Sequence, residues 1–325
     1  MADVAEIQKF NEFAEQHGRD DYHYHKIVAQ LQRAVIAGHD VQLHIHASYF
    51  NATHDGVKWV QDWSEYDFAS LSLERLNEIV GSGKARLESL LQPSCPDYRC
   101  FAFRAANWSV NPGKNVIKAL LNNGITIDTS VFKYGRRNGI VEFDYSDAAS
   151  ELVPWRVRED NLCSHDDRGQ LWEFPIYSEN RWIGAFFSLN RLYRVAQSRR
   201  HRISDNSLIP RAAPLGAPAK RRGLLSKLSF AAKKHAWKAD FNQCTGRQLI
   251  NALERAEKRY SRGPDPLPFV LIGHSKLFNR MNETSLRPFL QFVADHPARF
   301  GFATFRAFEK HLERAQPLDQ GSVPA

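Results

Sequence analysis

Two histidines spaced two residues apart are the first side chains in this sequence that could do chemistry. His44 and His46 close the apolar run Val41–His46, which predicts a strand. Residues i and i+2 of a strand point to the same face, so both imidazoles could reach one ligand. Neutral imidazole commonly binds Zn²⁺, Fe²⁺ and Co²⁺. The pair therefore predicts a metal site; the alternative is that one ring faces a pocket and the other packs in its wall.

Further polar side chains lie at or just after the ends of other apolar runs. The runs, each expected to be a strand, are Cys100–Arg104, Thr126–Phe132, Leu171–Tyr177, Phe269–Ile272 and Phe300–Phe305, and the polar residues are Arg104, Asp128, Glu173 and His274. Because the carboxyl ends of parallel strands are where sites are built in α/β proteins, we expect these residues to share one edge of a sheet.

Helical periodicity separates the predicted strands. Apolar residues recur with a period of about 3.6 residues in the stretches expected to be helices, which are Val4–His17, Leu73–Leu91, Gly113–Asn122, Thr245–Tyr260 and Ser285–Asp295. Strands that alternate with helices predict parallel βα units, arranged as a barrel or as an open doubly wound sheet.

The composition is that of an ordinary globular protein. The chain has 325 residues, 43% of them hydrophobic and 25% charged. It contains no apolar run of about 18 residues and no recognisable signal peptide, so we expect a cytoplasmic protein. The four cysteines have no CxxC spacing, which favours reduced thiols.

The net charge of +8 comes from one segment. Residues 190–240 contain 13 Lys or Arg and two acidic residues. We interpret them as a basic, partly disordered insertion in a single domain of residues 1–314, followed by a disordered tail at 315–325. The segment is either a solvated surface excursion or a site of peripheral contact with anionic lipid, at the inner membrane, or with an anionic glycan. No nucleic acid is expected, because no nucleic-acid-binding module surrounds the segment.

Five segments, taken in order, resemble a known family. They are Gly38–His46, Phe103–Ser109, Ile127–Ser130, Glu173–Pro175 and Gly273–Lys276, and they resemble the polysaccharide deacetylases, the NodB-homology proteins of carbohydrate esterase family 4. The similarity is greatest to the subgroup associated with bacterial surface-polysaccharide loci. The resemblance implies a deformed (β/α) barrel with a divalent metal, usually Zn²⁺, at its mouth. It also implies hydrolysis of an N-acetyl group on a glycan or a lipid-linked sugar.

The resemblance also implies roles for particular residues. His44 matches the first metal histidine; His46 supplies the second, although the family spacing would put that ligand at Ser48. The remaining assignments are Arg104 as the residue that orients the base, Asp128 as the residue that tunes the acid, His274 as the general acid and Trp108 as a wall of the substrate groove. The structural alternatives are a salt bridge for Arg104, a turn cap for Asp128 and a loop hydrogen bond for His274.

The family's first motif is not recognisable in this sequence. That motif is a strand ending in paired aspartates, which supply the catalytic base and the third metal ligand. We expect the strand with His44 to be the first, so that the barrel lacks one or two strands; Asp20 or Asp21 is expected to cap a helix. Three hypotheses follow: an active deacetylase whose sequence here starts too late, an inactive remnant that binds carbohydrate through Trp108, and a basic scaffold that binds a membrane or a polyanion.

Overall fold

The computed structural model describes residues 1–193, 232–260, 266–274 and 278–314. Their main sheet has seven strands in the order β1-β2-β5-β6-β11-β9-β10. The strands are β1 (Ala2–Asp3), β2 (Leu43–Ile45), β5 (Ala102–Ala105), β6 (Ile127–Asp128), β11 (Trp172–Glu173), β9 (Trp155–Arg158) and β10 (Asn161–His165). The first five are parallel, while β9 is antiparallel to both β11 and β10.

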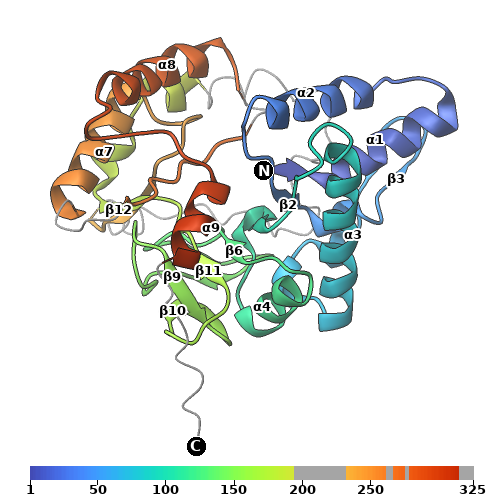
Figure 1. The fold of residues 1–325 in the computed structure, drawn as a ribbon, viewed down its shortest axis with the longest axis horizontal. Helices are drawn as coiled ribbons and strands as arrows, with labels where there is room; N and C mark the ends of the chain where they lie inside the picture. The colour runs from blue at the N-terminus through green and yellow to red at the C-terminus, as the bar shows by residue number, and fades with distance from the viewer. Residues whose placement is uncertain (194–231, 261–265, 275–277, 315–325) are drawn as a thin grey trace, which may run out of the picture.

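Four helices stand beside the first strands, as Figure 1 shows: α1 (Val4–His17), α2 (Tyr24–Ile36), α3 (Leu73–Leu91) and α4 (Gly113–Asn122). They bury the largest hydrophobic cluster against the sheet, with Leu43, Phe103 and Leu87 among its completely buried members. Helix α3 approaches β2 closely at Gly83, where an added Cβ would lie 3.2 Å from the Leu43 side chain. This close packing fixes the strand that carries His44.

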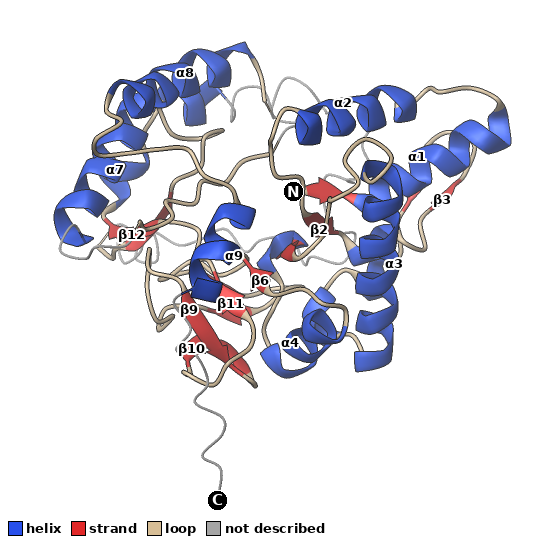
Figure 2. Ribbon diagram, in the orientation of Figure 1, coloured by secondary structure: helices blue, strands red, loops and turns tan. Residues whose placement is uncertain are grey.

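A second, smaller core lies on the other side of the molecule (Figure 2). It is formed by α7 (Gly246–Tyr260), α8 (Arg280–Asp295) and the antiparallel pair β12 (Ser178–Arg181) and β13 (His235–Lys238). The described chain also contains two further hairpins and several short 3-10 helices. The hairpins are β3 (Thr53–His54) with β4 (Trp59–Val60), and β7 (Arg136–Arg137) with β8 (Phe143–Asp144).

The predicted helices are confirmed more closely than the predicted strands. Val4–His17, Leu73–Leu91 and Gly113–Asn122 have the expected bounds, α7 begins one residue late and α8 begins five residues early. The helices are predicted better because their apolar residues repeat over ten or more positions, and this periodicity does not depend on the tertiary arrangement.

Two predictions about strands are wrong. A strand does precede the one with His44, because β1 pairs with β2 in parallel. The run Phe300–Phe305 is no strand: Phe302 is exposed and helix α9 (Phe305–Arg314) begins at Phe305. Both errors arise because the segments are short. The two residues of β1 are too few to show a period, and an apolar run as short as Phe300–Phe305 is compatible with either a strand or the start of a helix.

The barrel stays a prediction. Within the described residues the sheet runs from β1 at one edge to β10 at the other, and two parallel bridges, Ile176–Val270 and Asp240–Ile272, add short pieces beyond it.

The end of the proposed basic insertion belongs to the folded body. His235–Lys238 forms β13, although these residues lie within the segment interpreted as a partly disordered insertion. Residues 194–231 and the tail 315–325 lie outside the described residues, and so does the expectation that they are disordered. All four cysteines have free thiols, as predicted. No helix among the described residues has the length and apolarity needed to cross a membrane.

Candidate metal centre

Asp3, His44 and His46 lie together at the carboxyl edge of the parallel strands. One potential ligand atom from each residue lies within 4.8 Å of the others, and all three side chains are half-buried. Asp3 is paired with His44 in the β1–β2 register, so both residues point to the same side of the sheet. His46 follows β2 by one residue and brings its ring against that of His44, with 4.9 Å between centroids. Two imidazoles and one carboxylate form a donor set used for Zn²⁺ and Fe²⁺.

Asp3 occupies a junction between a strand and a helix. It is the last residue of β1 and the N-cap of α1, and its Oδ1 accepts a hydrogen bond of 3.4 Å from the Glu6 amide. Its Oδ2 lies 2.5 Å from Nδ1 of His46. One carboxylate thus stabilises the helix start with one oxygen and contacts a histidine with the other.

The His44 ring has a fixed tautomer. Its Nδ1 lies 2.8 Å from the carbonyl oxygen of Arg104, which can only accept a hydrogen bond, so Nδ1 carries the proton and Nε2 keeps its lone pair. Burial, followed by the charge of His46, lowers the pKa of His44 to about 3. The ring therefore remains neutral at physiological pH, which is the form that binds metals, and the carbonyl contact is the type of outer contact that orients such ligands.

One aromatic ring packs directly on the histidine pair. His46 stacks on Tyr49, with 4.7 Å between ring centroids. Burial, and then the charges of Asp3 and Glu6, raise the pKa of Tyr49. A second tyrosine contacts the loop that carries Trp108, since the Tyr66 hydroxyl donates to Oδ1 of Asn107 at 3.3 Å.

Trp108 is held in an uncommon backbone conformation. Asn107 and Trp108 have φ angles of 55° and 56°, a region that residues other than glycine seldom occupy. The Tyr145 hydroxyl donates to the Trp108 carbonyl at 2.5 Å, which helps to hold this conformation. Strained backbone of this kind concentrates at functional sites.

The Trp108 ring also contacts the ammonium group of a lysine side chain. Nζ of Lys238, from β13, lies 3.7 Å from the Trp108 ring centroid and 4.2 Å from that of Phe132. The ammonium group is thus held over two aromatic faces at the edge of the site. No local pattern connects Lys238, in the basic segment, with Trp108.

Arg104, Asp128 and Glu173 form a buried cluster beside the metal candidate. Asp128 and Glu173 are adjacent in the β6–β11 register, and both are completely buried. Arg104 donates to the carbonyl oxygen and the hydroxyl of Thr129, at 2.8 and 2.9 Å, and burial lowers its pKa to about 10. Its charge acts favourably on both carboxyl groups.

The two carboxyl groups lie close enough to act on each other's ionisation. Burial raises the pKa of both, and the neighbouring Asp128 raises that of Glu173 further. Oε1 of Glu173 accepts from the Val131 amide, whereas its Oε2 is buried with no donor beside it. Asp128 accepts from the amide and hydroxyl of Ser130. A proton on the Glu173 carboxyl would relieve the repulsion between the two groups.

His274 lies on the loop after the Asp240–Ile272 bridge. Its backbone amide donates to Oδ1 of Asn242 at 2.6 Å. Gly273 allows the loop to pack closely, since an added Cβ would lie 2.1 Å from the Phe241 ring. Asp128 accepts hydrogen bonds from Ser130 and lies beside Glu173 in the strand register, and its expected pairing with His274 stays a prediction.

The structure brings most of the predicted site residues into two neighbouring clusters. His44 and His46 meet as expected, and Arg104 and Asp128 meet with Glu173, which we expected at the same edge of the sheet. Asp3 was missed. The usable signal was an acidic residue just ahead of the helix starting at Val4, which is the position of an N-cap at a strand end. Asp20 does cap a helix, since its carboxylate accepts from the Tyr24 and His25 amides of α2.

Comparisons of the sequence with protein-family models and with curated proteins, and of the structure with solved structures, find no match. A function for this site has to be inferred from its own residues.

Proposed function

We propose that this protein is a metal-dependent hydrolase that removes an N-acetyl group from a sugar of a bacterial surface polysaccharide or its lipid-linked precursor. The observation that carries the proposal is the Asp3–His44–His46 cluster at the carboxyl edge of a parallel sheet. The five motif segments that resemble polysaccharide deacetylases support the same reaction class.

The donor set fits a divalent metal. His44 offers Nε2 because its Nδ1 is engaged by a carbonyl, and Asp3 and His46 lie within contact distance of each other. A bound metal of this type polarises an acyl carbonyl and lowers the pKa of water. Three protein ligands leave further coordination positions open, as catalytic zinc sites do.

The protein's own residues would bind and orient the substrate. Trp108 is partly exposed and offers an apolar ring to a substrate, since sugars pack on such rings through their C–H groups. Lys238 and Arg137 surround the same loop, because Arg137 donates to Asn107 at 3.3 Å. Arg104 and the Asp128–Glu173 pair hold the strand ends behind this surface in a fixed arrangement.

Glu6 is our candidate for the base that takes the proton from water. Ala2 precedes Asp3, so the other aspartate of the resembled family's pair has no counterpart in front of Asp3. Glu6 follows Asp3 by one helical turn, and its charge acts on Tyr49, the ring stacked on His46. His274 is retained as the candidate acid for the leaving amine.

The first test measures bound metal. We expect the purified protein to contain close to one equivalent of Zn²⁺, Co²⁺ or Fe²⁺ by inductively coupled plasma mass spectrometry, and a His44→Ala/His46→Ala variant to contain none. The matched control is His25→Ala/His39→Ala, which removes two exposed histidines outside the site. Metal retained in the site variant, or absent from the wild type after incubation with all three ions, contradicts the proposal.

The second measurement is acetate release from N-acetylated oligosaccharides. We expect release that is abolished in His44→Ala/His46→Ala and reduced at least about a hundredfold in Glu6→Gln, as for loss of a general base. A protein that binds metal and N-acetylated glycan but releases no acetate would instead be the carbohydrate-binding remnant, with Trp108→Ala abolishing its binding.

A further inference from the structure

The surface beside β12 and α7 exposes large apolar side chains that are close in sequence. Within residues 182–193, five such residues are exposed by 38% to 70%: Trp182, Phe187, Leu189, Leu192 and Tyr193. The segment is tied to the folded body, because Nε2 of Gln248 in α7 donates to the carbonyl oxygens of Ala185 and Phe187. We call these five residues the apolar face.

The polarity of this segment is reversed relative to an ordinary surface helix. A helix begins at Leu189, and Ser188 accepts a hydrogen bond of 3.0 Å from the Arg191 amide at its start. The polar residue Asn190 is buried and donates to the Cys244 carbonyl. Leu189, Leu192 and Tyr193, spaced i, i+3 and i+4, lie on the outward side instead. Polar groups thus anchor the segment, and apolar groups are directed away from the protein.

Basic residues flank the apolar face along the chain. Arg181 ends β12 and pairs with Glu179 at 3.1 Å, Lys233 and Lys234 precede β13, and Arg247 precedes Gln248 in α7. Nζ of Lys234 lies 5.7 Å from the centroid of the Trp182 ring. Residues 181–193 and 232–238 contain no Asp or Glu. Exposed aromatic and aliphatic side chains with a basic rim are the combination found where proteins lie in the headgroup region of a bilayer.

We propose that the apolar face and its basic rim bind the surface of an anionic phospholipid bilayer. The apolar side chains enter the headgroup region, and Arg181, Lys233, Lys234 and Arg247 contact lipid phosphates and carboxylates. A second copy of the chain fits less well, because a twofold contact through this face would set the same cations against each other. The proposal does not depend on the deacetylase activity.

The test is co-sedimentation of the full-length protein with vesicles. We expect binding to vesicles of phosphatidylcholine with phosphatidylserine, weak binding to phosphatidylcholine alone, and loss of binding as salt is raised. Two variants probe the two parts of the surface. Phe187→Ser/Leu189→Ser/Leu192→Ser should weaken binding at least about tenfold, because each buried apolar group contributes. Lys233→Glu/Lys234→Glu should also weaken it at least about tenfold, since both charges are reversed.

The matched control is Ile36→Ser/Val57→Ser/Phe302→Ser, which removes three equally exposed apolar residues elsewhere and should leave binding unchanged. Circular dichroism of each variant checks that it folds. The proposal is overturned by absence of binding to both kinds of vesicle, or by binding that neither surface variant weakens, which would assign it to another basic part of the chain. It is also overturned if light scattering finds a wild-type dimer that the apolar-face variant converts to a monomer.

Discussion

Asp128 and Glu173 are adjacent acidic residues that are both completely buried. A proton on one of them would remove the electrostatic repulsion between them. Two adjacent carboxylates in a dry environment would repel each other strongly, whereas an acid that donates to a carboxylate is stable there. Arg104 supplies the balancing positive charge. The pair therefore stabilises the fold only while Glu173 keeps its proton.

We predict that Glu173→Gln changes how stability depends on pH. The pKa of Glu173 is higher in the folded than in the unfolded state, so its contribution is complete below the ordinary value of 4.5 and is lost as pH rises through the folded-state pKa. Glutamine imitates the protonated acid and can donate to Asp128. Relative to the wild type, the variant should gain at most about 1.4 kcal/mol per pH unit above the unfolded pKa.

Urea denaturation across a pH series measures this effect. Glu257→Gln serves as the control of opposite sign. The bond with Arg299 lowers the pKa of Glu257, so the stabilisation it provides is present above the unfolded pKa and lost as pH falls. Parallel pH profiles for Glu173→Gln and the wild type would show that Glu173 is ionised in the folded protein.

At the scale of elements, the junction between β1 and α1 serves structure and site at once. Strand β1 is only two residues long, yet it determines where Asp3 lies, because its register with β2 sets Asp3 beside His44. Helix α1 then begins at the next residue and packs against the same strands, with Val4 and Ile7 buried. Capping and the proposed metal binding can be tested separately by mutation, because one oxygen of the carboxylate caps the helix and the other contacts His46.

We expect Asp3→Asn and Asp3→Ala to differ in stability but not in metal content. Asparagine is as good an N-cap as aspartate, so Asp3→Asn should unfold within about 0.5 kcal/mol of the wild type, whereas Asp3→Ala should lose about 1 kcal/mol. Both variants lack the carboxylate ligand and should lose the metal. Denaturation of the metal-free proteins compares their stabilities, and metal analysis compares their metal contents. Metal retained by Asp3→Asn would exclude the Asp3 carboxylate as a required ligand.

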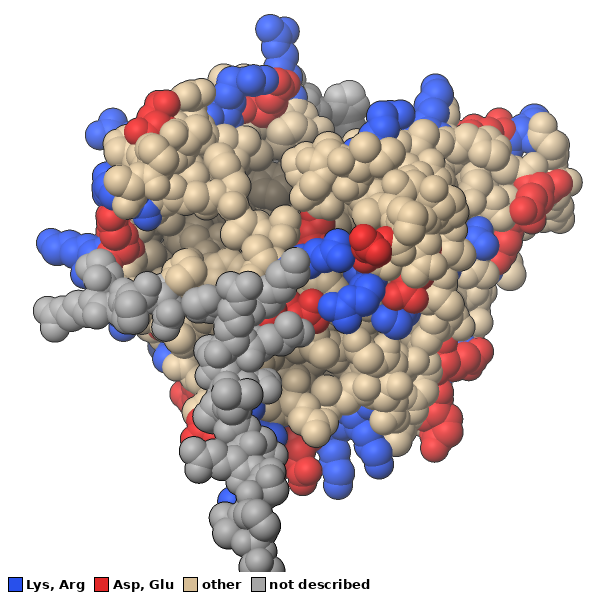
Figure 3. All heavy atoms as spheres, in the orientation of Figure 1, with Lys and Arg blue, Asp and Glu red and all other residues tan. Residues whose placement is uncertain are grey.

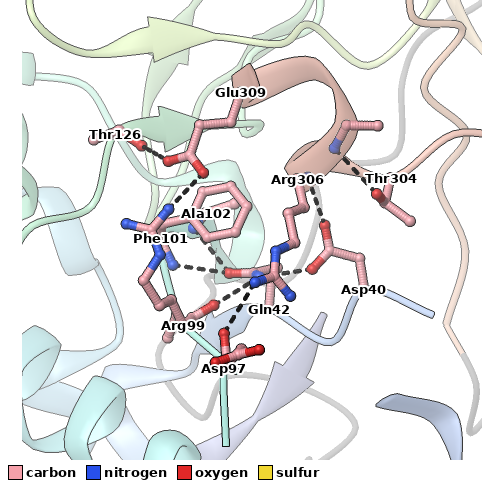
Figure 4. Close-up of polar contacts among 12 residues, drawn as sticks. Asp40, Gln42, Asp97, Arg99, Phe101, Ala102, Thr126, Thr304, Arg306 and Glu309 are labelled. Atoms are coloured by element: carbon pink, nitrogen blue, oxygen red, sulfur yellow. Dashed lines mark hydrogen bonds and ion pairs between the residues drawn. The ribbon is translucent and has the colours of Figure 1, made fainter. Parts of the chain in front are cut away.

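For the molecule as a whole, α9 joins the end of the described chain to the sheet. Figure 3 shows acidic and basic side chains gathered next to one another in this region, and Figure 4 resolves the contacts. Arg99 bonds to Glu309 at 2.7 Å, and the Arg306 amide donates to Asp40 at 3.1 Å. A cavity of about 80 Å³ lies beside them. Beneath these polar contacts, Phe305 and Phe308 pack edge-on against the buried Phe174.

We predict that apolar contact, rather than the ion pairs, docks this helix. Phe308→Ala should destabilise the protein by about 2–4 kcal/mol through loss of packing on Phe174. Arg99→Gln should cost no more than about 1 kcal/mol, because Arg99 is 60% exposed and solvent screens its ion pair. Guanidinium denaturation measures the free energy of unfolding of both variants. A larger loss of stability in Arg99→Gln than in Phe308→Ala would show that the ion pair, and not the apolar contact, docks the helix.

The sequence by itself determined the long helices, the alternation of strand and helix, and the histidine pair. These features are local: an amphipathic period over ten or more residues persists in any fold, and residues two apart in a strand share a face. Only the tertiary structure could decide that Asp3 joins His44 and His46, that Glu173 lies beside Asp128, and that Lys238 lies over Trp108. Each of these pairs is more than 40 residues apart and is brought together by strand register or by packing of the second core. No local pattern encodes that arrangement, because the free energy that selects it comes from burying the whole sheet and its helices at once.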